Sequence, residues 1–423
     1  MYKKLYGLCD CNNFFVSCER VFNPSLEKRP VIVLSNNDGC VVSRSNEAKA
    51  IGIKMGQPLY QLREIIKRHN VAVHSANYKL YGDMSERVMA TLKRHIQHIE
   101  IYSIDEAFLY LDGYPIDRLQ EFGRELSRTI RRNTGIPVSI GISHTKTLAK
   151  IAGRLCKQYP KLNGACLMYK ECDIEKVLSK FPIEEVWGIG HRHTKMLRQC
   201  GINTAAEFCN LSQEWIKNRM SITGLRTWNE LHGVPAIEFS HQAADKQSIT
   251  VSRSFAKELY DLEELHSTIT TFTGIAAEKL RKQHSVAQEL QVFILTNRHR
   301  EDQPQHHEAA ITHFTTPTDS TLEMVKEAAG LLRRIYRKGF GYKKAGISLG
   351  CILPNNAVQS QLFDKIDRPK HKQLMQAIDK INSTQGHEAV RLVSQGSITD
   401  YTHRDYLSPE YTTNWNDILT VKV

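Results

Sequence analysis

The sequence lacks any apolar run of the ~18 to 20 residues that a membrane-spanning helix requires. Its first ten residues, MYKKLYGLCD, hold too short an apolar stretch for a secretory signal peptide. It also shows no internal repeat and no low-complexity tract. We therefore expect a cytoplasmic protein with no membrane partner.

Cysteine pairs of the zinc-binding kind are also missing. The chain has ten cysteines, but they are scattered and no two have the Cys-x-x-Cys spacing. In the cytoplasm we expect them to be reduced, and mostly buried as small hydrophobic residues.

Acidic residues are fewer than basic ones, 45 Asp and Glu against 57 Lys and Arg, which leaves a net charge of +12. The simplest partner for such a surface is a polyanion, and nucleic acid is favoured over a membrane. The 423 residues, 41% of them hydrophobic, suffice for roughly two to four folded domains.

The first half of the chain has the order of a split βαβ sheet. Residues 5–9 are a short apolar strand, and a helix with one apolar side begins after Asn13. The segment IEIYSIDEAFLYLDG predicts a hairpin with strands over 99–103 and 107–112. A helix ending near Gly135 and a strand over 137–143 come next. This order predicts a ferredoxin-like sheet, with residues 18–78 as a small α/β insertion.

The second half changes character twice. Short helices separated by Gly and Pro occupy the stretch to about residue 235, and the polar residues 240–248 indicate a linker. Strands and helices alternate again from 249 to 352. The remaining residues are expected to form a tail with one helix, over 372–381. The fold class is thus a multidomain α+β or α/β protein.

Three acids stand at the predicted strand ends. Asp10 comes after the first strand, and Asp105 with Glu106 occupies the hairpin turn, so the sheet order would bring the three carboxylates together. Clustered carboxylates repel unless divalent cations lie between them, and hard oxygen ligands suit Mg²⁺. Two such ions are typical of phosphoryl transfer. Solvated turn residues are the alternative.

Longer motifs carry a resemblance to a known family. The segments CDCNNFFVSCE, SNNDGCVVSRSNEAKAIGIKMG, YSIDEAF, SIGISHTKTLAKIA and VWGIGHRHTKML resemble, in order, those of the Y-family DNA polymerases. SNNDGCV, NEAKA and the tail LSPEYTT are closest to the UmuC-type branch. The resemblance implies these domains: a catalytic palm (1–17 and 79–167), fingers (18–78), a helix-hairpin-helix thumb (168–235), a linker (236–248), an α/β little finger (249–352) and a C-terminal extension (353–423).

The resemblance also assigns roles to residues of the site. Asp10, Asp105 and Glu106 are implied to hold two Mg²⁺ ions together with the backbone carbonyl of Cys11. Phe15 falls on the steric gate, whose ring would clash with a ribose 2′-OH; a core aromatic is the alternative. Binding of the dNTP triphosphate is implied for Asn13, Phe14, Phe15, Ser43, Asn46, Lys49 and Lys157.

Two of these positions depart from many relatives, which have Tyr and Arg where this chain has Asn46 and Lys49. A planar, bidentate Arg contact is therefore missing, although Asn and Lys are typical of the UmuC-type branch. Ordinary solvated helix lysines are the alternative for Lys49 and Lys157.

Basic and glycine-rich segments suggest contacts with primer-template DNA. VWGIGHRHTK resembles the hairpin of a helix-hairpin-helix, in which glycines let backbone amides approach a phosphate. Lys146, Lys150 and Arg154 form a basic stripe at helical spacing. Solvated charged faces are the alternative for the basic segments. The predicted DNA-binding residues are Gly188, Gly190, Arg192, Lys195, Arg333, Arg334, Arg337 and Lys338.

The tail contains QSQLF, a pattern with which bacterial replication proteins dock on the sliding clamp. Gln359, Leu362 and Phe363 are its predicted contacts, the last two filling an apolar pocket. The remainder of the tail, to Val423, resembles the extension implicated in meeting a UmuD-type dimer and RecA.

These observations together predict an error-prone, template-directed DNA polymerase for translesion synthesis in the SOS response to DNA damage. The chain offers no obvious room for a proofreading exonuclease. Two alternatives come from other classes. A nucleotidyl cyclase shares the palm and paired acids but has no use for the DNA-binding segments. A non-catalytic DNA-bound scaffold would tolerate loss of the acids, and all three are present.

Overall fold

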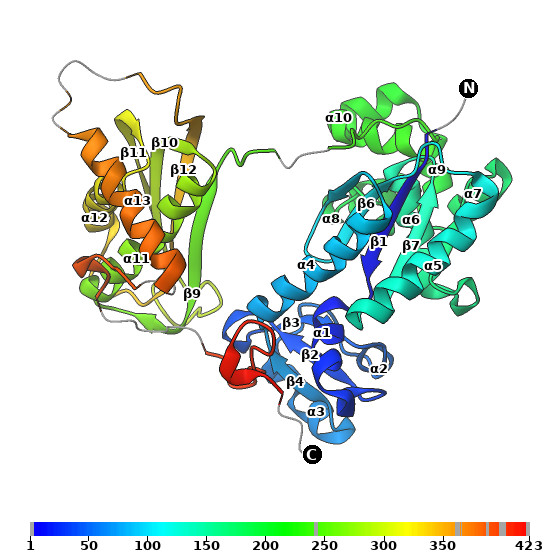
Figure 1. Ribbon diagram of the computed structural model, residues 1–423, viewed down its shortest axis with the longest axis horizontal. Coiled ribbons are helices and arrows are strands. Elements are labelled where there is room, and N and C mark those ends of the chain that lie inside the picture. Colours follow the sequence, from blue (N-terminus) through cyan, green and yellow to red (C-terminus); the bar gives the residue numbers. More distant parts are fainter. Residues whose placement is uncertain are drawn as a thin grey trace. The chain divides into compact units, whose positions relative to one another are not determined.

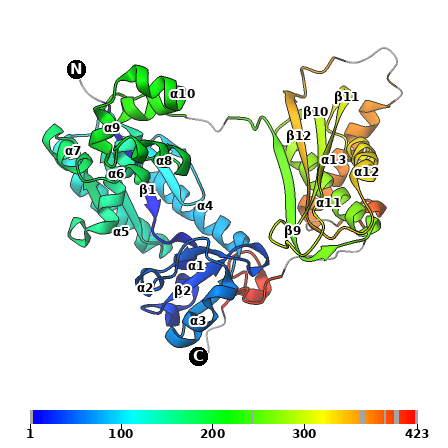
Figure 2. The ribbon, with the colours of Figure 1, turned by 180° about the vertical axis from the view of Figure 1, so that it is seen from behind.

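The computed structural model describes residues 4–240, 244–359, 364, 366–385, 389–396 and 403–419. The chain forms two compact units, one of Met1–Ala243 with Asp405–Val423 and one of Ala244–Arg404. The division after residue 243 falls inside the segment predicted as a linker. Figures 1 and 2 show both units from opposite sides.

The first unit is built on a five-stranded sheet of order β5-β6-β1-β7-β8. The first strand is antiparallel to both of its neighbours, whereas the last two strands are parallel. The strands are β1 (Tyr6–Cys11), β5 (Ile99–Ile101), β6 (Glu106–Tyr110), β7 (Val138–Ser143) and β8 (Ala165–Leu167). The expected hairpin is confirmed and lies beside the first strand as predicted.

The hairpin strands are shorter than predicted. The backbone N–H groups of Tyr102 and Ser103 both donate to the carbonyl oxygen of Glu106, at 3.0 and 3.1 Å. This tight turn ends β5 at Ile101, so Ser103 is a turn residue, and Glu106 is the first residue of β6.

Helices cover both faces of this sheet. Cys9, Ala107 and Leu109 belong to a core shared with helices α4 (Tyr78–His95) and α5 (Ile116–Thr134). On the opposite face Leu8 and Phe108 pack with Ala149 of helix α6 (Lys146–Gln158). Because side chains alternate along a strand, the odd and even positions of β1 face different helices. Asp10, at an even position of β1, lies on the face covered by α6.

The insertion between β1 and β5 contains its own three-stranded sheet, of order β3-β2-β4. A separate apolar cluster, including Ile32, Leu34 and Leu62, fills its interior. The elements are α1 (Phe14–Phe22), β2 (Val31–Leu34), β3 (Val41–Arg44), α2 (Asn46–Ala50), α3 (Arg63–His69) and β4 (Ala72–Ser75). The first of these helices packs in the core of the five-stranded sheet, although the sequence pattern predicts residues 18–78 as the insertion.

Residues 171–231 are helical, as the sequence predicts. The helices are α7 (Glu171–Leu178), α8 (His191–Gln199), α9 (Ala205–Cys209) and α10 (Gln213–Leu231). Their apolar side chains share one core with Ile151 and Cys156 of α6. Helix α6 is therefore packed on both sides, against the sheet and against this helical region.

The second unit is an antiparallel sheet of order β11-β10-β12-β9. Two helices share an apolar core with it. Its elements are β9 (Ile249–Leu259), α11 (Leu262–Lys282), β10 (Ser285–Thr296), β11 (His307–Thr318), α12 (Thr321–Ile335), β12 (Tyr342–Pro354) and α13 (Arg368–Gln385). The alternation of strands and helices is as predicted, and α13 extends beyond the helix expected over 372–381.

The predicted tail is divided between the units. Helix α13 belongs to the second unit, where Arg281 donates to both carboxylate oxygens of Asp379 at 2.7 Å. Residues 405–419 belong to the first unit and lie against the three-stranded sheet, as Figures 1 and 2 show in red.

All ten cysteines are free thiols, and five of them are buried. The expectation that most would be buried holds for half of them, since two more are only partly buried and Cys172, Cys200 and Cys351 are exposed. Within the described ranges, no helix combines the length and the apolar character needed to cross a membrane.

Candidate active site

Asp10 and Glu106 face each other across two neighbouring strands. They are direct partners in the antiparallel pairing of β1 with β6. Asp10 is two residues from Leu8 and Glu106 two residues from Phe108, so all four side chains lie on the face covered by α6. The local pleat thus places two of the three predicted acids together.

Asp105 joins them from the turn. Its carbonyl oxygen accepts a 2.8 Å hydrogen bond from the backbone N–H of Cys11, which holds the turn against the end of β1. The Ser103 hydroxyl donates to the Asp105 carboxylate at 2.6 Å, and the Asp105 N–H donates back to that hydroxyl at 3.2 Å. Asp105 precedes β6, so the alternation of the strand does not fix its side chain.

The electrostatics of Asp10 reflect this crowding. Burial raises the pKa of Asp10 to about 6, and the charges of Glu106 and Asp105 act in the same direction. The ammonium group of Lys157 opposes them. A buried carboxylate with two acidic neighbours favours a bound cation or a proton, which is a property of metal sites.

Helix α6 supplies two lysines to the acids. Lys157 Nζ lies 2.6 Å from Asp10 Oδ1. Lys150 Nζ lies 2.9 and 3.0 Å from the two carboxylate oxygens of Glu106. It also lies 4.7 Å from the ring centre of Tyr102 and 5.2 Å from that of Trp187. The aromatic rings and Glu106 hold this lysine in place.

A hollow of about 320 Å³ opens beside these groups. Its polar walls are Asp10, Glu106, Lys150, Arg154, Lys157 and Glu185. Asp105 is not among its lining residues. The hollow combines carboxylates with cationic side chains, which suits a ligand that carries both phosphate groups and metal ions.

The donor set fits Mg²⁺. The three carboxylates are hard oxygen ligands, and two of them already hold cations in the form of lysine ammonium groups. Burial raises the pKa of the Cys11 thiol well above its usual range, so the sulfur stays protonated and offers no soft thiolate ligand. Cys11 could contribute only its backbone carbonyl, the ligand that the resemblance assigns to it.

The side chains of three residues predicted to bind the nucleotide meet in the structure, although Asn13 is predicted to bind through its backbone amide. Lys49 Nζ donates to Asn13 Oδ1 at 2.6 Å, and both Lys49 Nζ and Asn13 Nδ2 donate to Asn46 Oδ1 at 3.2 Å. Asn13 has a left-handed backbone (φ 47°) and immediately precedes α1. Burial lowers the pKa of Lys49, and the nearby charges of Arg44, Lys157 and Arg154 lower it further. This concentration of positive charge is suited to an anion.

The other predicted nucleotide contacts are more buried. Phe14 is a core side chain, so only its backbone amide could reach a ligand. Ser43 lies on β3 and is 7% exposed. Phe15 is half-buried, with its ring stacked on Tyr81 at 4.5 Å and an interplanar angle of 13°. The core alternative for Phe15 and the gate therefore both fit its position.

The glycine-rich hairpin precedes α8. Gly188 has φ +92°, and a Cβ there would lie 2.5 Å from the Thr227 hydroxyl oxygen, so the position requires glycine. Gly190 is the N-cap of α8, and Arg192 and Lys195 are exposed on that helix. Trp187 instead packs inward, with its indole N–H donating to the Tyr102 hydroxyl at 3.2 Å.

The prediction that Lys146, Lys150 and Arg154 form an exposed basic stripe is wrong for the two lysines. The Lys146 side chain is 1% exposed and donates to Glu100 at 2.6 Å and to the Glu238 carbonyl at 2.7 Å. Lys150 binds Glu106, and Arg154 binds Glu185. Helical spacing placed the three residues on one side of α6, but Lys146 and Lys150 lie against the sheet and only Arg154 is exposed. The other basic segment is exposed, at Arg333, Arg334, Arg337 and Lys338.

Some contacts of the site were missed from the sequence. Ser103 stands two residues before Asp105, a spacing at which a hydroxyl can bind a nearby carboxylate or amide. Lys150 precedes Lys157 by seven residues, two helical turns, which places both on one side of α6. Nothing in the sequence indicates that Tyr81 supports Phe15.

The clamp motif is described only at its first residue. Gln359 is exposed. Leu362 and Phe363 lie outside the described residues.

Comparisons with protein families match most of the chain. Residues 9–154 match the impB/mucB/samB family, and residues 246–362 match the C-terminal domain of that family. Residues 372–421 match DUF4113, a domain of unknown function.

Relatives align over most or all of their lengths. Protein UmuC of Salmonella typhimurium strain LT2 is 38% identical over 422 residues, covering 99% of this chain and 100% of that protein. Protein ImpB of Salmonella typhimurium is 38% identical, covering 98% and 99%. DNA polymerase IV 1 of Bacillus subtilis strain 168 is 26% identical, covering 90% and 91%.

Solved structures share the fold. A chimeric Y-family DNA polymerase superposes with a TM-score of 0.67 at 21% identity, covering 83% of this chain and 100% of that one. DinB from Sulfolobus solfataricus gives a TM-score of 0.53 at 21% identity, covering 82% and 98%. Mixed α/β sheets and a separate antiparallel C-terminal sheet are the shared architecture.

Proposed function

Because the chain belongs to the UmuC/ImpB/SamB/MucB branch of the Y-family translesion DNA polymerases, we propose that it acts in the SOS response to DNA damage. It extends primers past damaged template bases, with two Mg²⁺ ions and without proofreading. The substrates of a DNA polymerase are primer-template DNA and dNTPs. The SOS role rests on the relatives and is independent of the geometry.

The observation that carries the chemistry is the pairing of Asp10 with Glu106 at one end of the central sheet, with Asp105 in the adjoining turn. Asp10 and Glu106 are strand partners, and Asp105 is tied to the end of β1. Metal-dependent nucleotidyl transfer needs such a set of hard oxygen ligands beside a cationic hollow.

Asp10, Asp105, Glu106 and the carbonyl of Cys11 would hold the two ions. When bound, Mg²⁺ lowers the pKa of the attacking 3′-hydroxyl and neutralises charge on the phosphates. Lys157, Lys49 and Asn13 lie where they can hold the triphosphate, with backbone amides at the start of α1 and the buried Ser43 hydroxyl as further contacts. Asn46 orients Lys49 and Asn13 by accepting from both.

Phe15 acts as the steric gate in this proposal. Its ring is fixed from behind by Tyr81, which leaves little freedom to yield to a 2′-hydroxyl. Replacing Phe15 with Ala should increase ribonucleotide insertion relative to deoxynucleotide insertion, measured by single-nucleotide kinetics. Undiminished deoxynucleotide selectivity would place the gate elsewhere.

DNA is held by surfaces outside this site in the proposal. Gly188, Gly190, Arg192 and Lys195 bind backbone phosphates, and so do Arg333, Arg334, Arg337 and Lys338. Gln359, Leu362 and Phe363 dock on the sliding clamp. A UmuD-type dimer and RecA are further proposed partners, and the location is cytoplasmic.

Primer extension with Mg²⁺ tests the proposal. Wild type should extend a primer across a template lesion, and Asp105→Asn should abolish extension. Asp112→Asn is the matched control, because Asp112 is an exposed acid at the other end of the hairpin and accepts a hydrogen bond from the Tyr110 hydroxyl. Failure of wild type to extend, even with a UmuD-type partner and RecA, would favour the scaffold alternative. Cyclic nucleotide formation would favour the cyclase.

A further inference from the structure

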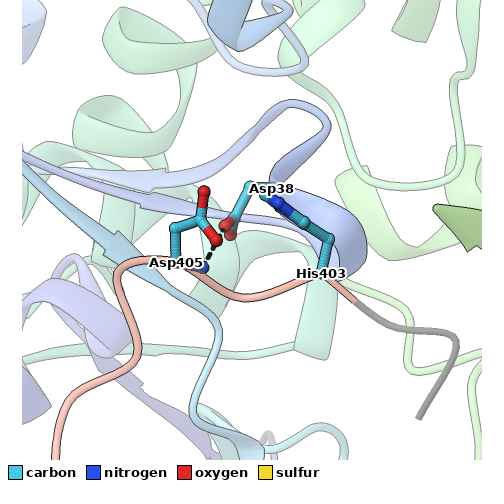
Figure 3. A group of neighbouring side chains, drawn as sticks. All are labelled: Asp38, His403 and Asp405. Atoms are coloured by element: carbon cyan, nitrogen blue, oxygen red, sulfur yellow. Dashed lines mark hydrogen bonds between the residues drawn. The ribbon is translucent and has the colours of Figure 1, made fainter. Parts of the chain in front are cut away.

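A short segment near the end of the chain packs against helix α1, which carries the proposed gate residue Phe15 and is here called the gate helix. Residues 405–411, here called the C-terminal clasp, lie within the region that matches the domain of unknown function. The N–H of Asp405 donates to Asp38 Oδ2 at 2.8 Å, as Figure 3 shows. The N–H of Tyr406 donates to Ser75 Oγ at 3.0 Å, and the Ser75 N–H donates to the Tyr406 carbonyl at 3.0 Å. The clasp is thereby fixed to the end of β4.

Ser408 is the buried residue of the clasp, with 8% of its surface exposed, whereas Tyr406 and Leu407 are exposed. Burial of a small polar side chain requires hydrogen-bond partners. Asn77 Nδ2 lies 3.1 Å from both the Ser408 hydroxyl and its carbonyl oxygen. The Ser408 hydroxyl then donates to Glu19 Oε1 at 3.0 Å.

Glu19 connects the clasp to the gate. This carboxylate is 1% exposed and lies on α1, four residues after Phe15. The same oxygen that accepts from Ser408 also accepts from the Tyr81 hydroxyl, at 2.6 Å. The ring of Tyr81, in turn, stacks on Phe15. A continuous series of contacts therefore runs from Ser408 through Glu19 and Tyr81 to Phe15.

The geometry favours a role in positioning over a general surface attachment. Burial raises the pKa of Glu19, and the two hydroxyl donors oppose that rise. Each donor therefore stabilises the charged form of a buried group, and loss of one leaves Oε1 with a single hydroxyl donor, while His74 Nδ1 lies 3.7 Å from the other oxygen. Tyr81 is completely buried, so a change in its hydroxyl contact must be absorbed by its ring or by Glu19.

We propose that the C-terminal clasp is a positioning element for sugar selection, in which Ser408 and Glu19 hold Tyr81 against the gate residue Phe15. This inference rests on the proposed function, because it assumes that Phe15 selects the sugar. Ser408, Glu19 and Tyr81 act through Phe15 and touch no substrate.

The test uses the full-length chain in single-nucleotide insertion, with kcat/KM measured for a dNTP and for the matching rNTP. Ser408→Ala and Tyr81→Phe should each lower the dNTP-to-rNTP ratio about 3- to 10-fold, the range that loss of one hydrogen bond covers. Ser408→Thr and Glu19→Gln keep the hydroxyl and the acceptor oxygen and should retain the wild-type ratio. Glu410→Gln is the matched control in the clasp, since its partner Lys79 is exposed and their ion pair contributes little.

Phe15→Ala is measured in parallel, which separates two failures. If Phe15→Ala leaves the ratio unchanged, the proposed gate is refuted. If Phe15→Ala lowers the ratio but Ser408→Ala and Tyr81→Phe behave like Glu410→Gln, the gate stands and the positioning role of the clasp is overturned. An equal loss of kcat/KM for the dNTP and the rNTP would also overturn it, because it would show that the clasp only stabilises the fold.

Hydrogen exchange gives a second measurement that does not depend on activity. Ser408→Ala should speed amide exchange in residues 14–22 and 78–85, whereas Glu410→Gln should not. Unchanged exchange in Ser408→Ala would show that the clasp does not support the gate helix and would contradict the proposal.

Discussion

Two glycines that face each other provide a matched test of how α6 is placed over the acids. Gly141 lies in β7 and Gly153 lies opposite it in α6. A Cβ added at Gly141 would lie 2.1 Å from the carbonyl oxygen of Ala149 and 2.2 Å from the backbone nitrogen of Gly153. A Cβ added at Gly153 would meet nothing closer than 3.8 Å. The same substitution to Ala therefore has opposite consequences at the two positions.

These distances determine the expected changes in the free energy of unfolding. Relief of the clash in Gly141→Ala requires the α6 backbone to withdraw by about 1 to 2 Å, because carbon and oxygen atoms pack at roughly 3.3 to 4 Å. Overpacking against backbone costs about 3 kcal/mol. Gly153→Ala gains helix propensity and a few contacts and should stabilise by about 0.5 to 1 kcal/mol.

Primer extension should follow stability in the two variants. Lys150 and Lys157 reach Glu106 and Asp10 at 2.9 and 2.6 Å, so a helix displaced by about 1 Å breaks both contacts. Misplacement of this size can lower a catalytic rate by about 100-fold. Gly141→Ala should therefore lose primer extension, and Gly153→Ala should retain it.

Thermal unfolding and primer extension measure the two effects on full-length protein. For a unit of this size, Gly141→Ala should lower the unfolding temperature of the first unit by about 6 to 10 °C, and Gly153→Ala should raise it by about 1 to 3 °C. A Gly141→Ala protein that melts with wild type, or a Gly153→Ala protein that loses as much stability, would refute the reasoning about close backbone packing.

Three further predictions concern charges. Burial raises the pKa of Asp10 to about 6, so between about pH 4 and pH 7 the folded chain holds a proton that the unfolded chain releases. The free energy of unfolding of the metal-free protein, measured in EDTA, should therefore rise as the pH falls from about 7 to about 4. Asp10→Asn should remove this dependence and stabilise the metal-free chain at pH 7 by on the order of 2 kcal/mol in urea unfolding; identical pH profiles would contradict it. Arg281→Met leaves Asp379 without its partner and should destabilise the second unit by about 2 to 3 kcal/mol, whereas an unchanged unfolding midpoint would show that the pair contributes nothing. A triple variant with Gln at Arg333, Arg334 and Arg337 should reduce the salt slope of primer-template binding by about 3. An unchanged slope would remove this surface from the DNA interface.

Local sequence pattern predicted the acids because it reports on strand order. A predicted apolar strand with Asp10 at its end and a predicted hairpin turn with Glu106 leave few arrangements in a split βαβ sheet. The observed register, in which Asp10 of β1 pairs with Glu106 at the start of β6, is one of them. Side-chain alternation then places both carboxylates on one face. The hairpin, the helical region and the alternation in the second unit are predictable from similarly local signals.

Contacts between distant segments were not predictable in this way. The spacing of Lys146, Lys150 and Arg154 shows that they share a side of α6, but it does not show whether that side meets solvent or protein. The tail presents the same difficulty. Ser408 binds Glu19, 389 residues earlier in the chain, and neither residue stands in a periodic pattern that would indicate burial. Hydrogen bonding of this kind becomes visible only in the folded chain.

In the proposed function, the chemistry and the selection of the sugar depend on different parts of the structure. The acids are fixed by the pairing of β1 with β6 and β7, which depends on backbone hydrogen bonds within one sheet. Phe15 instead stands on α1, whose far side is held by Tyr81, Glu19 and a segment near the C-terminus. If Phe15 is the gate, changes in that segment should therefore alter which nucleotide is accepted without moving the carboxylates. Hydrogen bonds and an aromatic stack between Phe22 and Tyr411 at 4.8 Å attach the clasp, so we expect its release to require less free energy than opening of the central sheet.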